Sequence, residues 1–315
     1  MKRILIILVA FVLVVTGCSS KSEKKKFILA AMPAEGQNTL DSKHQLLIQE
    51  LQAALGDNYV VEGTLAENYA AVSSAVVTGT AQAGWDSPNT YATSHIADPD
   101  VVPLVSYAVN GDRTKAFYTA YIAVLKEHEA DFAGKTTEEE KLAVLKGKSM
   151  SFVDPKSTSG FLVPSTTFYK YFGPDGTKEI SLRADLTTPG KFFSEVVFAG
   201  DHPLSVESLV SKKTYASAFC CDYGSAAMDQ MVVLAKAEVF NGAFYVSKKY
   251  VTDEEIQKIT EHFVNLTPQN SVAGFFDAST GFFFDKTKPA AATDTRFFKT
   301  TVEDYNIFYE MNKVK

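Results

Sequence analysis

Short apolar runs alternate with helical patterns along most of this 315-residue chain, and this alternation limits the fold more than any other feature. FILAAM (27–32), NYVVEG (58–63) and AQAGW (81–85) each have the length and composition of a strand. Between the first two, residues 42–55 carry leucines on one helical face and stop at Gly56. Alternation of this kind favours an α/β fold with a mainly parallel sheet and helices on both faces.

Helix and strand limits can be predicted in the same way at less regular positions. Thr64 and Glu67 have the spacing of a capping box, so we expect a helix to begin at Thr64 and to end at Gly79. The segment KEISLRAD (178–185) has a strand pattern, and residues 190–198 have a helical one.

The alternation starts again after the apolar run at 118–125, with SMSFVD (149–154) and YASAFCC (215–221) as further strands. We therefore expect two similar α/β lobes, between which the chain crosses near residues 120–125 and 235–245. In parallel sheets ligands bind beyond the carboxyl ends of the strands, so the strand-to-helix loops are the candidate sites. The predicted limits are 27–123 and 237–315 for lobe 1 and 124–236 for lobe 2.

The first residues have the pattern of an export signal. Lys2 and Arg3 precede the apolar run 4–15, which is too short for an ordinary transmembrane helix, and VTGC (15–18) has the form of a bacterial lipobox. We predict that residues 1–17 are a cleaved signal peptide, that Cys18 is lipidated, and that residues 18–26 are a polar tether. The protein would then be anchored on the extracytoplasmic face of a membrane. The alternative is an ordinary secretory signal with an incidental cysteine.

Net charge excludes one class of partner. Without Lys2 and Arg3, 29 of the 31 basic residues remain against 37 acidic residues, which leaves a charge of −8. This balance argues against binding of nucleic acid. An anionic ligand would have to be held by directed hydrogen bonds.

Two adjacent cysteines, Cys220 and Cys221, lie in the run YASAFCC. They can form a vicinal disulfide or have a catalytic role, but the apolar surroundings favour buried, unreactive thiols. The chain has no CxxC spacing for a metal, and we predict neither a metal site nor a cofactor.

A serine-rich loop at the start of a predicted helix is the strongest candidate site. In DPKSTSGFLVP (154–164), three hydroxyl residues and a glycine follow a strand: Ser157, Thr158, Ser159 and Gly160. A helix N-terminus offers unpaired N–H groups and a partial positive charge, so it can bind an anion without a cationic side chain. The structural alternative is that Ser159 caps the helix and the other hydroxyls are solvated.

Several segments, in the same order, resemble a known family. LKGKSMSFVDPKSTSGFLVP (145–164), ENYAAVSSAVVTGTAQAGWDSPNTYATS (67–94), YTAYIAV (118–124) and AGDHPLSVESLVSKKTYASAF (199–219) are similar to segments of the phosphate/phosphite/phosphonate class of ABC-transporter solute-binding proteins. The resemblance covers residues 28–310. It implies the two-lobed type II fold of periplasmic binding proteins, a small oxyanion as ligand, and ABC permease subunits in the membrane as partners. We expect a monomer.

The second lobe supplies two further candidates. His202 precedes a proline at a predicted helix start, where it is either a cap or a donor to an anion; the resemblance implies that it faces the ligand. Asp222 follows a strand and either caps a helix or accepts a hydrogen bond from a ligand amine or a protonated phosphonate.

The first lobe supplies four further candidate ligand-binding residues. Tyr69 and Tyr118 carry phenol groups that can donate to an oxyanion while their rings exclude water. At the end of the third strand, Trp85 is a candidate wall of the cleft and Ser87 a candidate donor. For each tyrosine, packing in the core is an equally good explanation.

Three other functions remain possible on sequence grounds. Ser157, His202 and Asp222 have the residue types of a hydrolase triad, but no G-x-S-x-G elbow accompanies Ser157, so we predict that the protein is not an enzyme and has no catalytic residue. A receptor of the same fold for a thiamine-like or other heterocyclic compound is a closer alternative. A sensory surface lipoprotein is the third.

Overall fold

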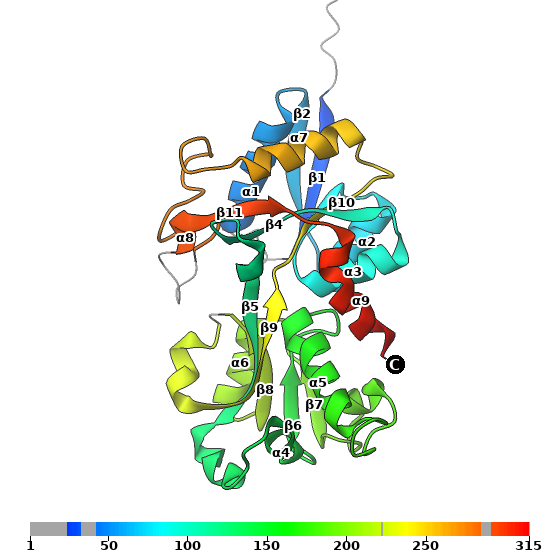
Figure 1. Cartoon of the computed structure of the whole chain (residues 1–315), viewed down its shortest axis with the longest axis vertical. Helices are drawn as coiled ribbons and strands as arrows, with labels where there is room; N and C mark the ends of the chain where they lie inside the picture. Colours follow the sequence, from blue (N-terminus) through cyan, green and yellow to red (C-terminus); the bar gives the residue numbers. More distant parts are fainter. Residues whose placement is uncertain (1–23, 33–41, 222, 285–290, 315) are drawn as a thin grey trace, which may run out of the picture.

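The computed structural model describes residues 24–32, 42–221, 223–284 and 291–314, which form two α/β lobes connected by two long strands (Figure 1). The predicted signal peptide, Cys18 and Asp222 lie outside these residues.

The first lobe, at the top of Figure 1, is built on a sheet whose described strands have the order β11-β4-β10-β3-β1-β2. β2 and β3 pair with β1 in parallel, whereas β10 is antiparallel to β3 and β4, and β11 is antiparallel to β4. The strand bounds are β1 Lys25–Ala31, β2 Tyr59–Leu65, β3 Ala83–Trp85, β4 Val101–Val109, β10 Phe244–Ser247 and β11 Thr295–Lys299.

Helices cover both faces of this sheet. On one face, leucines of α1 and Ile259 and Phe263 of α7 join the apolar side chains of the strands in a single core. On the other face, Tyr91 of α3 and Phe308 of α9 pack with Tyr245 of β10, next to α2. The helix bounds are α1 Ser42–Leu55, α2 Tyr69–Thr78, α3 Pro88–Ala97, α7 Asp253–Val264, α8 Ala291–Asp294 and α9 Asn306–Lys313, with short turns η1 Arg113–Lys115 and η6 Val302–Tyr305.

The second lobe has a sheet whose described strands follow the order β7-β6-β8-β5-β9. β7 and β8 pair with β6 in parallel, and β5 is antiparallel to β8 and β9. The strands are β5 Phe117–Leu125, β6 Ser149–Phe152, β7 Glu195–Phe198, β8 Ala216–Cys220 and β9 Met231–Phe240. The helices are α4 Glu138–Ala143, α5 Val163–Phe172 and α6 His202–Val210, with short helical segments η2 Lys126–Phe132, η3 Thr158–Leu162 (a π-helix), η4 Arg183–Thr187 and η5 Ser225–Gln230.

β5 and β9 connect the two lobes. They pair along their whole length, from Phe117 opposite Phe240 to Leu125 opposite Met231. In Figure 1, β5 runs from the top lobe into the bottom one and β9 runs back in the opposite direction. The lobe limits predicted from the sequence fall inside these two strands. Both sheets are mixed. Parallel pairs are found between strands that are joined through helices, whereas the strands near the two crossings pair antiparallel.

Three local predictions are wrong. Thr64 lies inside β2, and α2 begins at Tyr69, where the side chain of Asn68 accepts a hydrogen bond from the Ala71 N–H. The segment 190–198 contains strand β7 instead of a helix, because residues 195–198 complete the sheet beside β6. The segment 178–185 contains no described strand and leads into η4.

Candidate functional site

The STSG loop (residues 157–160) follows β6 and opens the helical segment η3–α5. Ser157 has extended backbone angles and caps η3, since its Oγ accepts a hydrogen bond from the Gly160 N–H at 3.1 Å. Ser157, Thr158 and Ser159 are 1%, 0% and 2% exposed. The hydroxyls of the loop are therefore held inside the protein, not solvated as the structural alternative requires.

Gly160 is required by packing in the second lobe. A Cβ atom at this position would lie 2.4 Å from the Cβ of Val153, which is closer than real contacts allow. The Gly160 carbonyl also accepts a hydrogen bond from the Val153 N–H at 3.2 Å. The glycine therefore lets the start of the helix lie directly against the end of β6.

The beginning of α3 in the first lobe meets the STSG loop of the second. The Asn89 N–H donates to Thr158 Oγ1 at 2.8 Å, and Asn89 Nδ2 donates to the Lys156 carbonyl at 2.9 Å. Ser87 caps α3 and its hydroxyl lies 3.4 Å from the same carbonyl. Two helix beginnings, one from each lobe, are thus in direct contact.

Tyr118 lies beside this contact, at the start of β5. Burial raises the pKa of its phenol, opposed by hydrogen bonds with Ser159 and Thr158, while the electrostatic effect of Tyr107 raises it further. The phenol therefore stays protonated at neutral pH and can donate a hydrogen bond. The structure brings Tyr118 and the STSG loop together.

His202 is the first residue of α6, whose cap is Asp201. The imidazole is 6% exposed, and burial lowers its pKa to about 4. Because the Cys220 N–H donates to His202 Nδ1 at 3.2 Å, the ring proton of the neutral form is on Nε2. The ring also stacks on Tyr223, with 5.4 Å between centroids. At neutral pH, His202 is an uncharged donor.

Cys220 and Cys221 form a vicinal disulfide, so the preference for free thiols is wrong. Cys221 has a φ of 61°, in the left-handed region. Cys220 Sγ lies 3.6 Å from His202 Nε2. Cys220 of the disulfide therefore contacts the His202 ring through both its N–H and its sulfur. The two adjacent cysteines in the sequence did not indicate this contact.

For the remaining predicted site residues, no contact with the STSG loop has been described above. Tyr69 is the first residue of α2 and is half-buried in the first lobe; the contacts given above do not include it. Trp85 ends β3, directly before the loop that carries Ser87, and is also half-buried. Asp222 lies outside the described residues, so its role stays a prediction.

Sequence analysis missed four side chains of this region, those of Asn89, Asn312, Arg183 and Asp86. Asn312 of α9 donates from Nδ2 to Asn89 Oδ1 at 2.7 Å, and Arg183 of the second lobe donates to the Met311 carbonyl at 2.7 Å. No local pattern links positions that are 223 and 128 residues apart in the chain. Both contacts tie the C-terminal helix of the first lobe to the interface between the lobes.

Asp86 is the other missed residue with a titratable group. Its Oδ1 accepts a hydrogen bond from the Tyr245 hydroxyl at 3.3 Å, and its buried Oδ2 has no hydrogen-bond partner among the described residues. Burial raises the pKa of Asp86 well above its usual range, which favours the uncharged form. Its position, in the DSP sequence after a strand, could have suggested a role.

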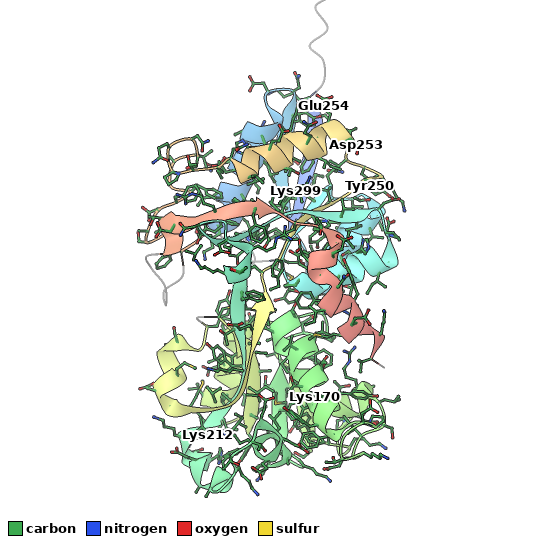
Figure 2. All side chains as sticks on the ribbon, in the orientation of Figure 1. Lys170, Lys212, Tyr250, Asp253, Glu254 and Lys299 are labelled. Atoms are coloured by element: carbon green, nitrogen blue, oxygen red, sulfur yellow. A yellow bond between two sulfur atoms is a disulfide. The ribbon has the colours of Figure 1, made fainter. Side chains whose placement is uncertain are left out.

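Several charged side chains lie far from this junction. Figure 2 shows Asp253 and Glu254 at the far end of the first lobe and Lys212 on the second lobe, where it pairs with Glu127 at 2.6 Å. A groove of about 570 Å³ lies between α7, β4 and η6, and none of its described lining residues belongs to the predicted site. Within the residues that the structure describes, no group of three or more metal-ligating side chains is placed to hold an ion.

The described groups at the junction of the lobes are therefore mainly neutral hydrogen-bond donors. They can bind a small oxyanion, which needs several convergent donors and gains from two helix N-termini. Two α/β lobes joined by two strands, with such a junction, define the class of bilobed solute-binding proteins.

Comparison with known proteins gives the family. The sequence matches the family described as "ABC transporter, phosphonate, periplasmic substrate-binding protein" over residues 29–294, and the chain belongs to this family. It is 24% identical over 243 residues to the phosphate-import protein PhnD of Mycolicibacterium smegmatis, a match that covers 75% of this chain and 70% of the relative.

Solved structures confirm the two-lobed type II fold. A binding-protein component of an ABC phosphonate transporter from Pseudomonas aeruginosa has a TM-score of 0.66 at 15% identity, with 92% of this chain and 86% of that chain covered. PhnD1 from Prochlorococcus marinus, in complex with methylphosphonate, has a TM-score of 0.67 at 15% identity, with 92% and 97% covered.

Family membership confirms the predicted function at the level of the transporter. The protein is the extracytoplasmic solute-binding component of an ABC importer of the phosphonate class. In the described part of the chain, no helix has the length and apolarity needed to cross a membrane.

Proposed function

We propose that the protein captures a phosphate-, phosphite- or phosphonate-like oxyanion between its lobes by hinge closure and delivers it to the permease. The observation that carries this proposal is the contact of the α3 start with the STSG loop, 2.8 Å between Asn89 N and Thr158 Oγ1. A ligand bound to both helix beginnings would favour the closed arrangement, because each lobe supplies donors that a solvated open form leaves apart.

The proposed ligand shell consists of neutral groups. From the second lobe it includes the STSG loop, His202 as an Nε2–H donor, and Asp222 as an acceptor for a protonated or substituted ligand. From the first lobe it includes Ser87, Tyr69 and Trp85, with Tyr118 at the crossing. The methylphosphonate complex of PhnD1 from Prochlorococcus marinus supports a ligand of this chemistry.

Closure would occur about β5 and β9, with the predicted lobe limits at 123/124 and 236/237 inside these strands. We further propose a monomer without catalytic activity that is held to the membrane by a lipid on Cys18. Cys18→Ser should move the protein from the membrane fraction to the soluble fraction, and retention in the membrane would contradict the anchor.

Calorimetric titration of the full chain with phosphate, phosphite and methylphosphonate tests the binding function. At 100 times its dissociation constant a ligand should stabilise the protein by about 2.7 kcal/mol in a thermal unfolding measurement. Ser159→Ala should weaken binding at least tenfold, because a buried oxyanion loses a donor.

Ser165→Ala is the matched control, since Ser165 is equally buried in α5 but donates within the helix to the Leu162 carbonyl. If the Ser159 and Ser165 variants bind the oxyanion with equal affinity, the STSG loop only caps its helix. Failure of all three oxyanions to bind would contradict the proposed function itself.

A further inference from the structure

Trp85, at the end of β3, and Tyr107 of β4 form an aromatic pair in the first lobe. Their rings stack with 5.7 Å between centroids and an interplanar angle of 26°. Both side chains are half-buried, whereas the rings behind them are buried: Phe244 at 0%, Phe297 at 3% and Phe282 at 7% exposed. The aromatic pair is therefore a partly accessible surface on a fixed support.

The supporting rings hold the aromatic pair in place from several elements. Phe282 contacts Trp85 edge-on, with 5.3 Å between centroids, and Phe297 of β11 does so at 6.0 Å. The Tyr107 carbonyl accepts a hydrogen bond from Asn241 Nδ2 at 2.9 Å, next to the second crossing. Edge-to-face and stacked contacts of this kind fix ring orientation.

The aromatic pair adjoins the groups proposed to bind the oxyanion. Trp85 is two residues from Ser87, whose helix start contacts the STSG loop. Tyr107 acts electrostatically on Tyr118, which in turn bonds to Ser159. The β3–α3 loop therefore joins Trp85 to the residues that meet the STSG loop, and Tyr107 is near enough to Tyr118 to affect its phenol.

The carboxyl group next to the aromatic pair in the β3–α3 loop is held by a contact within the first lobe. Asp86, the acidic residue next to Trp85 in the chain, is bonded to the Tyr245 hydroxyl, and burial raises its pKa. A ligand with an ammonium substituent would find no ionised carboxylate in this described loop. Phosphate or methylphosphonate, in turn, has no group large enough to cover two rings.

We propose that the aromatic pair is a subsite for the ligand's substituent and takes a flat aromatic ring, so that the ligand is an aryl phosphonate or aryl phosphate monoester. This inference rests on the proposed function, since the oxyanion itself would be held by the STSG loop. The substituent ring stacks on the aromatic pair and removes its remaining apolar surface from water. The pair thus determines specificity among oxyanions.

Titration of the full chain with inorganic phosphate, methylphosphonate, phenylphosphonate and phosphocholine tests this subsite. Phenylphosphonate should bind at least tenfold more tightly than methylphosphonate. Trp85 is the one tryptophan in the sequence, so its fluorescence reports directly on the subsite. Phenylphosphonate should change this emission more than methylphosphonate does.

Trp85→Leu should reduce the ratio of phenylphosphonate to methylphosphonate affinity to about one, and Tyr107→Leu should reduce it several-fold. Tyr169→Leu, which removes a half-buried ring from the second lobe, is the matched control and should keep the ratio. Circular dichroism of each variant verifies folding. The ratio in the unaltered protein needs no variant, so it tests the subsite even if a substitution prevents folding.

The outcomes separate the two proposals. If phosphate and methylphosphonate bind but phenylphosphonate is no tighter, the aromatic subsite is wrong and the proposed function stands. Tighter binding of phosphocholine than of phenylphosphonate would replace the aryl ligand by a quaternary ammonium and overturn the assignment. If none of the four compounds binds, the proposed function fails.

Discussion

The two lobes present different kinds of surface to the space between them. The second lobe offers buried donors that are fixed by contacts within that lobe, such as Ser157 with Gly160 and His202 with Cys220. The first lobe offers half-buried rings and a helix start whose Asn89 side chain is held by α9. Under the proposed function, the second lobe would be preorganised for the oxyanion, whereas the first lobe would distinguish substituents and complete the site on closure.

The strongest test of preorganisation is the pH dependence of stability. The folded protein keeps His202 neutral to about pH 4, but the unfolded chain takes up a proton near pH 6.5. This group therefore contributes stability above pH 6.5 that is lost as the pH falls towards 4, up to about 3 kcal/mol. Denaturant unfolding between pH 7.5 and 4.5 measures it.

His202→Gln gives the comparison, because an amide does not titrate while its oxygen can still accept from the Cys220 N–H. The pH dependence between 6.5 and 4.5 should be shallower in this variant. An identical slope in both proteins would mean that His202 is not held neutral by burial.

A smaller effect is expected from the contact between the lobes. Thr158→Val removes the acceptor of the Asn89 N–H, so the closed form loses a buried hydrogen bond and oxyanion affinity should fall about tenfold, which is roughly 1.4 kcal/mol. Calorimetry measures the affinity. Thr167→Val is the control, since the Thr167 hydroxyl bonds only to the Val163 carbonyl among the described contacts. Equal losses of oxyanion affinity in the two variants would show that Thr158 has no specific role in closure.

The smallest effect is expected at the C-terminal helix. Arg183→Ala removes the donor to the Met311 carbonyl at the end of α9, so ligand-free protein should be more open and oxyanion affinity should fall twofold to fivefold. Small-angle scattering of the ligand-free protein measures the opening. Lys135→Ala, an exposed cation of the same lobe, should leave the scattering unchanged. A compact Arg183 variant would show that this contact does not hold the lobes together.

Local patterns predicted most of the elements of the second lobe that carry the site. The sequence of β6 and the STSG loop indicated a strand, a cap and a helix in succession, but the cap is Ser157 and not Ser159. The wrong local predictions lie where pairing with a neighbouring strand determines the secondary structure. Residues 195–198 have a helical pattern but pair with β6 as a strand. Thr64 was expected to begin a helix but lies in β2, where it pairs with Ala30 of β1.

The sequence by itself determined that the chain is an α/β protein of two lobes and that the STSG loop lies at a helix start, because strand and helix periodicity and capping residues act over a few positions. Only the tertiary structure decided which groups meet that loop. Asn89 meets the loop, and Asn312 of α9 holds the Asn89 side chain; both contacts join residues far apart in the chain. The same reason explains the glycine at position 160, where a Cβ atom would clash with Val153.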